Sequence, residues 1–232
     1  VATRPITDMA AYRERLQRFV FRSGLLMKPV FDQAARDPKR VVYAEGEVDR
    51  VLYAAQQALS LGIAQPILIG DTDRITRRLG ELGLTVRPGT DVSIVDPGRF
   101  DAEDYAADLH RRAGTQGVSP RDALGEVRHD PTVLACLMLV RGEADAAICG
   151  SGGRFGHHLN RLEGIVGRKS GVRALSTLNA LVLPQATIFI ADAYVNLDPT
   201  AEEIADLTEL AAATMRGMGV VPRAALVSHA NF

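Results

Sequence analysis

The chain has 232 residues, of which 47% are hydrophobic and 24% charged, and its formal net charge is −1. This balance is typical of a soluble globular protein large enough for one large domain or two small ones. The near-neutral charge and the lack of a lysine- or arginine-rich block argue against nucleic acid as a partner. No apolar stretch approaches the roughly 18 residues of a membrane span, so no membrane partner is expected.

In chain order, the first elements are helical. Residues 7–21 place apolar side chains at helical spacing after a Thr7 or Asp8 N-cap, and a second helix is predicted at 27–36. Short apolar strands at 40–44, 66–69 and 91–95 then alternate with helices at 48–61 and 71–82. This alternation predicts a parallel sheet with helices on both faces.

Two or three further helices are expected in 102–141, the last beginning at Asp130-Pro131, before a strand of the same sheet at 145–149. From residue 172 the pattern changes. Strands at 174–183 and 187–191 are expected to pair antiparallel, followed by a helix at 200–218 and a strand at 223–228. We therefore divide the chain into a helical lead-in (1–39), a first α/β lobe (40–154) and a second α/β lobe (155–232).

Cys136 and Cys149 each lie in an apolar run, and the absence of a CxxC pair excludes a zinc ribbon or thioredoxin motif. We interpret them as buried, reduced thiols of a cytoplasmic protein, because no signal peptide is present. The chain begins at Val1 rather than Met and stops at Phe232 directly after an apolar segment. We expect both ends to be cuts in a longer polypeptide.

The stretch CGSGGRFGHHLNR (149–161) follows the predicted strand at 145–149 and carries the main candidate site. Its glycines let a backbone approach a phosphate closely, and the following helix offers free N–H groups. It is neither a Walker A loop nor a GxGxxG fingerprint, and a simple tight turn is the alternative. The two adjacent histidines face different directions on a helix, so no metal site is expected. The candidate ligand-binding residues here are Ser151, Gly152, Gly153, Arg154, His157, Asn160 and Arg161.

Other polar groups follow predicted strands. Glu45 could face a ligand crevice with Arg50 one turn into the next helix, although an acidic helix-capping turn is the alternative. Asp192 and Asn196 are candidates that an Asx turn would also explain. Ser228, His229 and Asn231 end the chain, where a phosphate-binding turn is a better interpretation than a Ser-His hydrolase site.

Several segments together resemble the phosphate acetyltransferase (phosphotransacetylase) family. They are EGEVDRVLYAAQQALSLGIAQPILIG (45–70), GEADAAICG (142–150) and the stretch from FIADAYVNLDP to the end (189–232). The leading residues 4–31, the segment DPTVLACLMLVRGEADAAICG (130–150) and the terminal SHANF are similar to the phosphotransacetylase-like domain of hybrid NADP-dependent malic enzymes. The similarity runs in order over nearly the whole chain.

The resemblance implies a two-lobed, three-layer αβα fold of the isocitrate/isopropylmalate dehydrogenase type, with the second lobe incomplete at Phe232 and acetyl-CoA held between the lobes. The sequence departs from the catalytic members. They carry a Ser/Thr-Asp-Thr-x-Arg-Pro run after the small-residue turn, whereas His157, His158 and Asn160 stand here and Arg161 is one residue out of register. The segment that carries their catalytic carboxylate would lie beyond Phe232.

We therefore expect no catalytic residue here, but an acetyl-CoA-binding regulatory and oligomerising domain of a malic enzyme, which decarboxylates malate oxidatively to pyruvate. The expected partners are acetyl-CoA or CoA as effector, the malic enzyme domains of the same polypeptide, and a second copy in a homodimer formed through helix 200–218 or its neighbours. No resident cofactor or metal is expected in these residues, since NADP and a divalent metal belong to the malic enzyme domains. The alternatives are an active phosphate acetyltransferase and a purely architectural dimerisation domain.

Overall fold

The computed structural model describes residues 8–9, 27–113, 117–183 and 186–227. The chain divides into two compact units, one of Gln33–Gly167 and one that combines Val1–Asp32 with Arg168–Phe232. Residues 27–36 are helical as predicted, whereas the helix predicted at 7–21 lies almost wholly outside the described residues. None of the described helices is long and apolar enough to cross a lipid bilayer.

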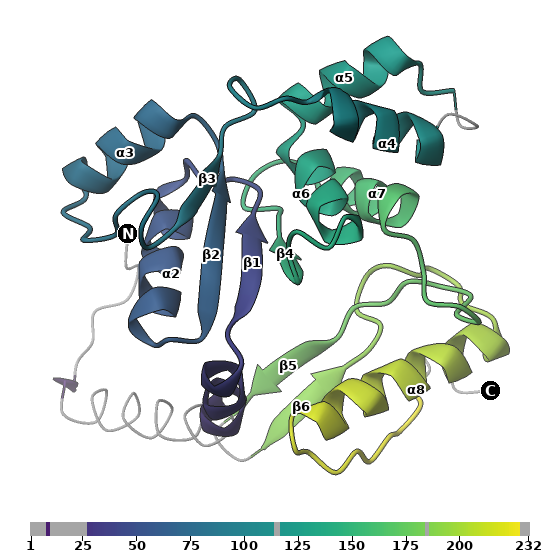
Figure 1. Ribbon diagram of the computed structural model, residues 1–232. Coiled ribbons are helices and arrows are strands. Elements are labelled where there is room, and N and C mark those ends of the chain that lie inside the picture. Colours follow the sequence, from purple (N-terminus) through teal and green to yellow (C-terminus); the bar gives the residue numbers. More distant parts are fainter. Residues whose placement is uncertain (1–7, 10–26, 114–116, 184–185, 228–232) are drawn as a thin grey trace. The chain divides into compact units, whose positions relative to one another are not determined.

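The Gln33–Gly167 unit is built on a four-stranded parallel sheet in the order β3-β2-β1-β4 (Figure 1). The strands are β1 (Lys39–Tyr43), β2 (Ala64–Ile69), β3 (Ser93–Val95) and β4 (Ala146–Ile148). All four lie where the sequence predicts them. The chain steps from β1 outward to β3 and then returns to place β4 on the other side of β1, which confirms the predicted parallel α/β fold.

Helices cover both faces of this sheet. They are α2 (Asp49–Ser60), α3 (Thr72–Glu81), α4 (Glu103–Ala113), α5 (Pro120–His129), α6 (Pro131–Val140) and α7 (Phe155–Ile165). Successive side chains of a strand point to opposite faces, so Tyr43 and Leu68 pack with α2 and α3, while Val42 packs with the helices of the other face. The result is two apolar cores with the sheet between them.

Helix α6 lies at the centre of the second core. It is buried from Thr132 to Met138, because its sequence is apolar on every side. Asp130 caps its first turn by accepting hydrogen bonds from the N–H groups of Thr132 and Val133, and Pro131 occupies the first turn, where no N–H is needed. The predicted helix start at Asp130-Pro131 is confirmed.

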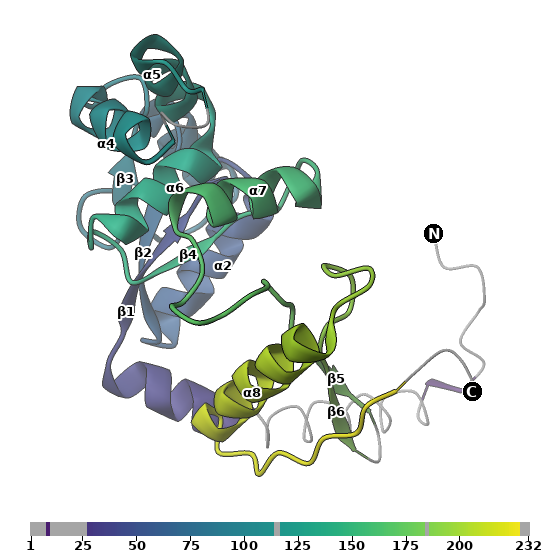
Figure 2. The same cartoon turned by 90° about the vertical axis from the view of Figure 1, so that its right-hand side faces the viewer.

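Helix α7 packs against α6 (Figure 2) and buries Ile165 in the same core. The compact unit therefore extends to Gly167, whereas the lobe boundary was predicted at residue 154. The difference has a simple physical cause. A boundary drawn from sequence follows the glycine run at 150–153, but the helix after it buries its apolar side chains against the first unit.

The second unit contains an antiparallel pair, β5 (Asn179–Val182) and β6 (Thr187–Ile190), and the helix α8 (Ala201–Gly217). The pairing and the helix agree with the prediction. Thr200 and Glu203 begin α8 with a capping box, in which each side chain satisfies the other residue's N–H. Arg173, in the segment before β5, forms a 3.0 Å ion pair with Asp206 on α8.

The strand predicted at 223–228 is wrong for the part that the structure describes. Residues 221–227 form no regular structure, and Val221, Leu226 and Val227 are 83%, 77% and 92% exposed. The apolar composition suggested a strand, but a strand needs a neighbour to pair with, and none of the described residues provides one.

Candidate functional site

The candidate site lies where β1 and β4 end side by side. In the sheet, β2 lies on one side of β1 and β4 on the other, so the direction in which strands are added reverses at β1. In open parallel sheets such a reversal leaves a crevice at the carboxyl ends of the strands. The ladder ends with the N–H of Ala44 donating to the carbonyl of Ile148 at 2.9 Å. Glu45 leaves β1 and Gly150 leaves β4 at this point.

A glycine turn at 150–153 connects β4 to α7. Gly150 and Gly153 have φ angles of 89° and 85°, in the left-handed region that side chains disfavour. A Cβ atom on Gly153 would also lie only 3.0 Å from Nε2 of His158. Glycine is therefore required at these two positions by the course of the backbone.

Three side chains from three elements hold this turn. Oε1 of Glu45 accepts from the N–H of Gly150 at 2.8 Å. Nη2 of Arg50, on α2, donates to the carbonyl of Ser151 at 2.6 Å. Nε2 of His158, on α7, lies 2.7 Å from the carbonyl of Gly152. Three peptides of the turn are thus each held by a different part of the unit.

The held turn keeps several polar groups unused. In the part of the chain that the structure describes, no acceptor is bonded to the N–H groups of Ser151, Gly152 or Gly153. Oγ of Ser151 is buried and also lacks a hydrogen-bond partner among these residues. Buried polar groups are nearly always satisfied, so the buried Oγ of Ser151 marks the turn as a place for a polar ligand. The N–H groups of Gly152 and Gly153 belong to exposed residues, where such a ligand could reach them.

The cations after the turn have different surroundings. Arg161 donates to Oδ2 of Asp130 at 3.2 Å and pairs with Oε2 of Glu126 at 3.0 Å, while Nε2 of His157 lies 2.9 Å from Oδ2 of Asp130. Arg161 and His157 are therefore both engaged with these carboxylates. Arg154, at the N-cap of α7, is exposed and makes no such ion pair with a described residue. Asn160 is exposed on the same helix.

The thiols near the site are poor nucleophiles. Burial raises the pKa of Cys149, which directly precedes the turn, and raises that of Cys136 to about 12. Both are free cysteines. Because the thiolate is the reactive form, neither residue is suited to covalent catalysis near neutral pH.

Asp192 and Asn196 belong to the second unit and hold their own loop together. Burial alone would raise the pKa of Asp192, but hydrogen bonds from Thr177 (2.7 Å) and from the backbone and side chain of Asn196 (2.6 and 2.7 Å) outweigh it and hold the pKa well below its usual range. The Asx turn considered from the sequence accounts for both residues. Ser228, His229 and Asn231 lie outside the described residues.

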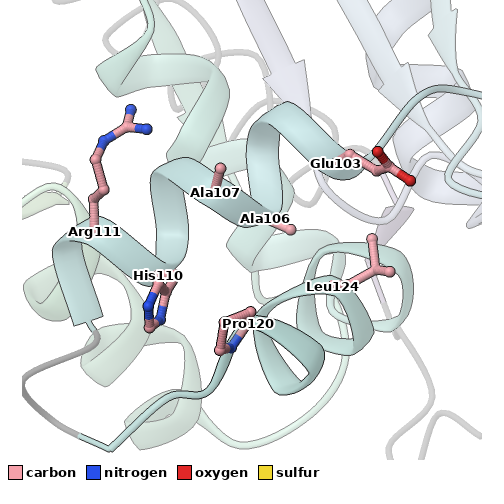
Figure 3. A pocket seen from close by; sticks show the side chains of 7 residues that line it. All are labelled: Glu103, Ala106, Ala107, His110, Arg111, Pro120 and Leu124. Atoms are coloured by element: carbon pink, nitrogen blue, oxygen red, sulfur yellow. The ribbon is translucent and has the colours of Figure 1, made fainter.

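Several hollows occur among the described residues of the Gln33–Gly167 unit, one of them, of about 530 Å³, along α5 beside Glu126 and Asp130, and two others bear on the argument. One, of about 220 Å³, lies at the carboxyl ends of β1 and β2, where Glu45, Glu47 and Arg128 line it. Glu45 thus borders both this cavity and the glycine turn. The other, of about 370 Å³, is a groove between α4 and α5, where Ala106 and His110 face Pro120 and Leu124 (Figure 3). Among the described residues no group of three or more His, Cys, Asp or Glu side chains is arranged to hold a metal ion.

The model of the phosphate acetyl/butaryl transferase family matches residues 25–232. The chain belongs to this family. The resemblance inferred from the sequence is therefore confirmed. Among solved structures, the EutD phosphotransacetylase from Staphylococcus aureus superposes with a TM-score of 0.74 at 20% identity, covering 84% of this chain and 58% of its own, which supports the phosphotransacetylase fold.

Within the family, two kinds of relative match. The chain is 49% identical over its whole length to an NAD-dependent malic enzyme from Rhizobium meliloti (strain 1021) and 44% identical to the NADP-dependent malic enzyme of Escherichia coli (strain K12). It spans only 30% and 31% of those relatives. A phosphate acetyltransferase from Nitratidesulfovibrio vulgaris is 31% identical over 87% of this chain, which spans 28% of that protein. The chain is thus homologous to the phosphotransacetylase-like part of malic enzymes.

The sequence-based site list of this phosphotransacetylase-like chain contains the turn but not the side chains that hold it. The sequence places Glu45 where it could face the crevice, but an acidic helix-capping turn is the favoured interpretation there, and neither Glu45 nor Arg50 is a predicted site residue. No pattern in the sequence points to Thr132, whose hydroxyl lies 2.8 Å from Nδ1 of His158. The signal that could have identified Glu45 is its position at the end of β1, the strand at which the sheet order reverses.

Proposed function

We propose that these residues form an acetyl-CoA-binding regulatory domain of a malic enzyme and do not catalyse acyl transfer. The observation that carries the proposal is the held glycine turn at 150–153, with its unused N–H donors. CoA carries phosphate groups, and backbone N–H groups at the start of a helix are suited to bind them. The proposal also takes the domain as cytoplasmic and as part of a homodimer.

Arg154 is the cation best placed to serve an anionic ligand at the turn. It directly follows Gly153 and caps α7, and its side chain is exposed. A guanidinium bound to a phosphate oxygen makes a charge-assisted hydrogen bond worth about 1.5–3 kcal/mol. The buried Oγ of Ser151, which has no partner among the described residues, would gain one from the same ligand.

The surroundings of Arg161 and His157 favour regulation over catalysis. Acyl transfer to phosphate requires cations that hold the second substrate in line with the acyl group. Arg161 is occupied by Glu126 and Asp130, and His157 by Asp130, so recruiting them for phosphate would break these pairs. The protonated thiols offer no alternative nucleophile.

The malic enzyme relatives supply the context of the regulation. In such a polypeptide, acetyl-CoA at this domain would alter the oxidative decarboxylation of malate elsewhere in the chain, where NADP and a divalent metal would bind. A signal of this kind requires that acetyl-CoA has different affinities for two states of the polypeptide.

The test is isothermal titration of acetyl-CoA into the full-length polypeptide, as wild type, Arg154→Ala and Arg77→Ala. Arg77 is exposed on α3, which packs on the sheet face opposite to α7, and serves as the matched control. Arg154→Ala should weaken binding about tenfold, since about 1.4 kcal/mol is a factor of ten, and should blunt the response of malate oxidation to acetyl-CoA. Arg77→Ala should do neither. Equal affinity in all three proteins would refute the assignment of Arg154.

A further inference from the structure

The imidazole of His158 lies against the glycine turn and uses both of its nitrogens. A Cβ atom on Gly150 would lie 3.7 Å from the ring, and one on Gly153 only 3.0 Å from it, so the turn follows the ring closely. Nε2 lies 2.7 Å from the carbonyl oxygen of Gly152, and Nδ1 lies 2.8 Å from Oγ1 of Thr132. The ring therefore connects the turn to the start of α6.

The chemistry of these contacts fixes the proton on the ring. A carbonyl oxygen only accepts, so Nε2 must carry the hydrogen that it donates to Gly152. In the neutral ring Nδ1 is then the acceptor, and the hydroxyl of Thr132 donates to it. Thr132 is 1% exposed, and its own N–H donates to Asp130 at 3.0 Å, so the anchor of the ring is rigid.

Holding the Gly152 carbonyl also orients a donor. In a planar trans peptide the C=O and the next N–H point in opposite directions. The hydrogen bond from His158 therefore turns the N–H of Gly153 away from the imidazole. In the same way, the bond from Arg50 to the Ser151 carbonyl turns the N–H of Gly152 away from the guanidinium. Both N–H groups lack an acceptor among the described residues.

We propose that His158 is a positioning residue, which acts through the peptide that joins Gly152 and Gly153 to aim an N–H donor at an anionic group of acetyl-CoA. This inference rests on the proposed function. His158 does not touch the ligand. It restricts the conformation of a glycine peptide before the ligand binds. The conformational entropy of that peptide is therefore not lost on binding.

Two substitutions separate this role from simple packing. In His158→Gln the side-chain amide nitrogen reaches the place of Nε2 and can donate to Gly152, whereas in His158→Asn it reaches only the place of Nδ1, beside Thr132. Titration of acetyl-CoA into the full-length polypeptide should give an affinity within about threefold of wild type for Gln and a loss of about tenfold for Asn. Thermal unfolding of both variants shows whether they are comparably folded.

A spectroscopic measurement checks the same geometry without the ligand. Two-bond ¹H–¹⁵N correlation of the imidazole should show the Nε2–H tautomer in wild type. An Nδ1–H tautomer, or equal affinities of the Gln and Asn variants, would overturn the positioning role. If wild-type protein itself binds no acetyl-CoA, the proposed function fails, and the ligand assigned to the positioned donor falls with it.

Discussion

Replacing Gly153 by Ala, beside a matched Gly152→Ala variant, tests the geometry of the turn in which the candidate site is built. Gly153 has a φ angle of 85°, and an added Cβ would lie 3.0 Å from Nε2 of His158. Gly152 is its neighbour, but its φ is not in the left-handed region and a Cβ there would meet nothing within 4 Å. The two variants add the same methyl group to adjacent residues.

The expected difference follows from the backbone. A side chain in the left-handed region costs about 1–2 kcal/mol. Ala at a compatible glycine position instead stabilises by about 0.4–1 kcal/mol, because the unfolded chain loses conformational freedom. The free energies of unfolding should thus differ by about 1.5–3 kcal/mol between the variants, with Gly153→Ala the less stable. The approach to His158 adds to this difference, since the ring is held by Thr132 and cannot move freely.

Urea unfolding of the full-length polypeptide, followed by circular dichroism, measures the difference. A scan of temperature should show the unfolding of this domain at a lower temperature in Gly153→Ala than in Gly152→Ala. Gly153→Ala should also weaken acetyl-CoA binding, because it displaces the peptide that His158 holds. Two variants of equal stability and equal affinity would refute the geometry assigned to the turn.

Two further predictions concern the core and the half-buried phenol of Tyr105. Leu134→Ala should lower the free energy of unfolding in urea by about 2–5 kcal/mol, because Leu134 on α6 is 0% exposed. Leu197 is 102% exposed, so Leu197→Ala should stay within about 0.5 kcal/mol of wild type. Equal effects of the two substitutions would contradict the described core. Burial and a hydrogen bond to Glu143 raise the pKa of Tyr105 to about 12. The folded state therefore holds the phenolic proton more tightly than the unfolded chain, in which the pKa is about 10. The free energy of unfolding should thus fall as the pH rises from about 10 towards 12. Tyr105→Phe should remove that alkaline loss in urea titrations at about pH 9 and pH 11, and an unchanged pH dependence would count against the assignment.

The strands and helix starts of the first unit were predictable because their signals are local. Alternating short apolar runs mark β1 to β4, and Asp130-Pro131 carries its own capping chemistry. The strand predicted at 223–228 failed for the opposite reason. Residues 223–227 have the composition of a strand, but composition does not supply the partner on which a strand depends.

The turn was predictable in position but not in how it is held. Glycines after an apolar strand locate it, whereas Glu45 contacts Gly150 and Arg50 contacts Ser151 across roughly a hundred residues of sequence. The same limit applies to Arg161. Its position after the turn suggests a ligand cation, and only the fold shows that Glu126 on α5 and Asp130 at the start of α6 already pair with it.

The central claim is that this member of the phosphate acetyl/butaryl transferase family binds acetyl-CoA without transferring its acetyl group. The most direct test is one preparation of the full-length polypeptide, titrated with acetyl-CoA by calorimetry and assayed for acetyl phosphate in the presence of acetyl-CoA and inorganic phosphate. We predict saturable binding and no acetyl phosphate. Formation of acetyl phosphate would establish an active acyltransferase, and a folded protein that releases no heat and retains no acetyl-CoA in equilibrium dialysis would contradict the claim by leaving only an architectural role.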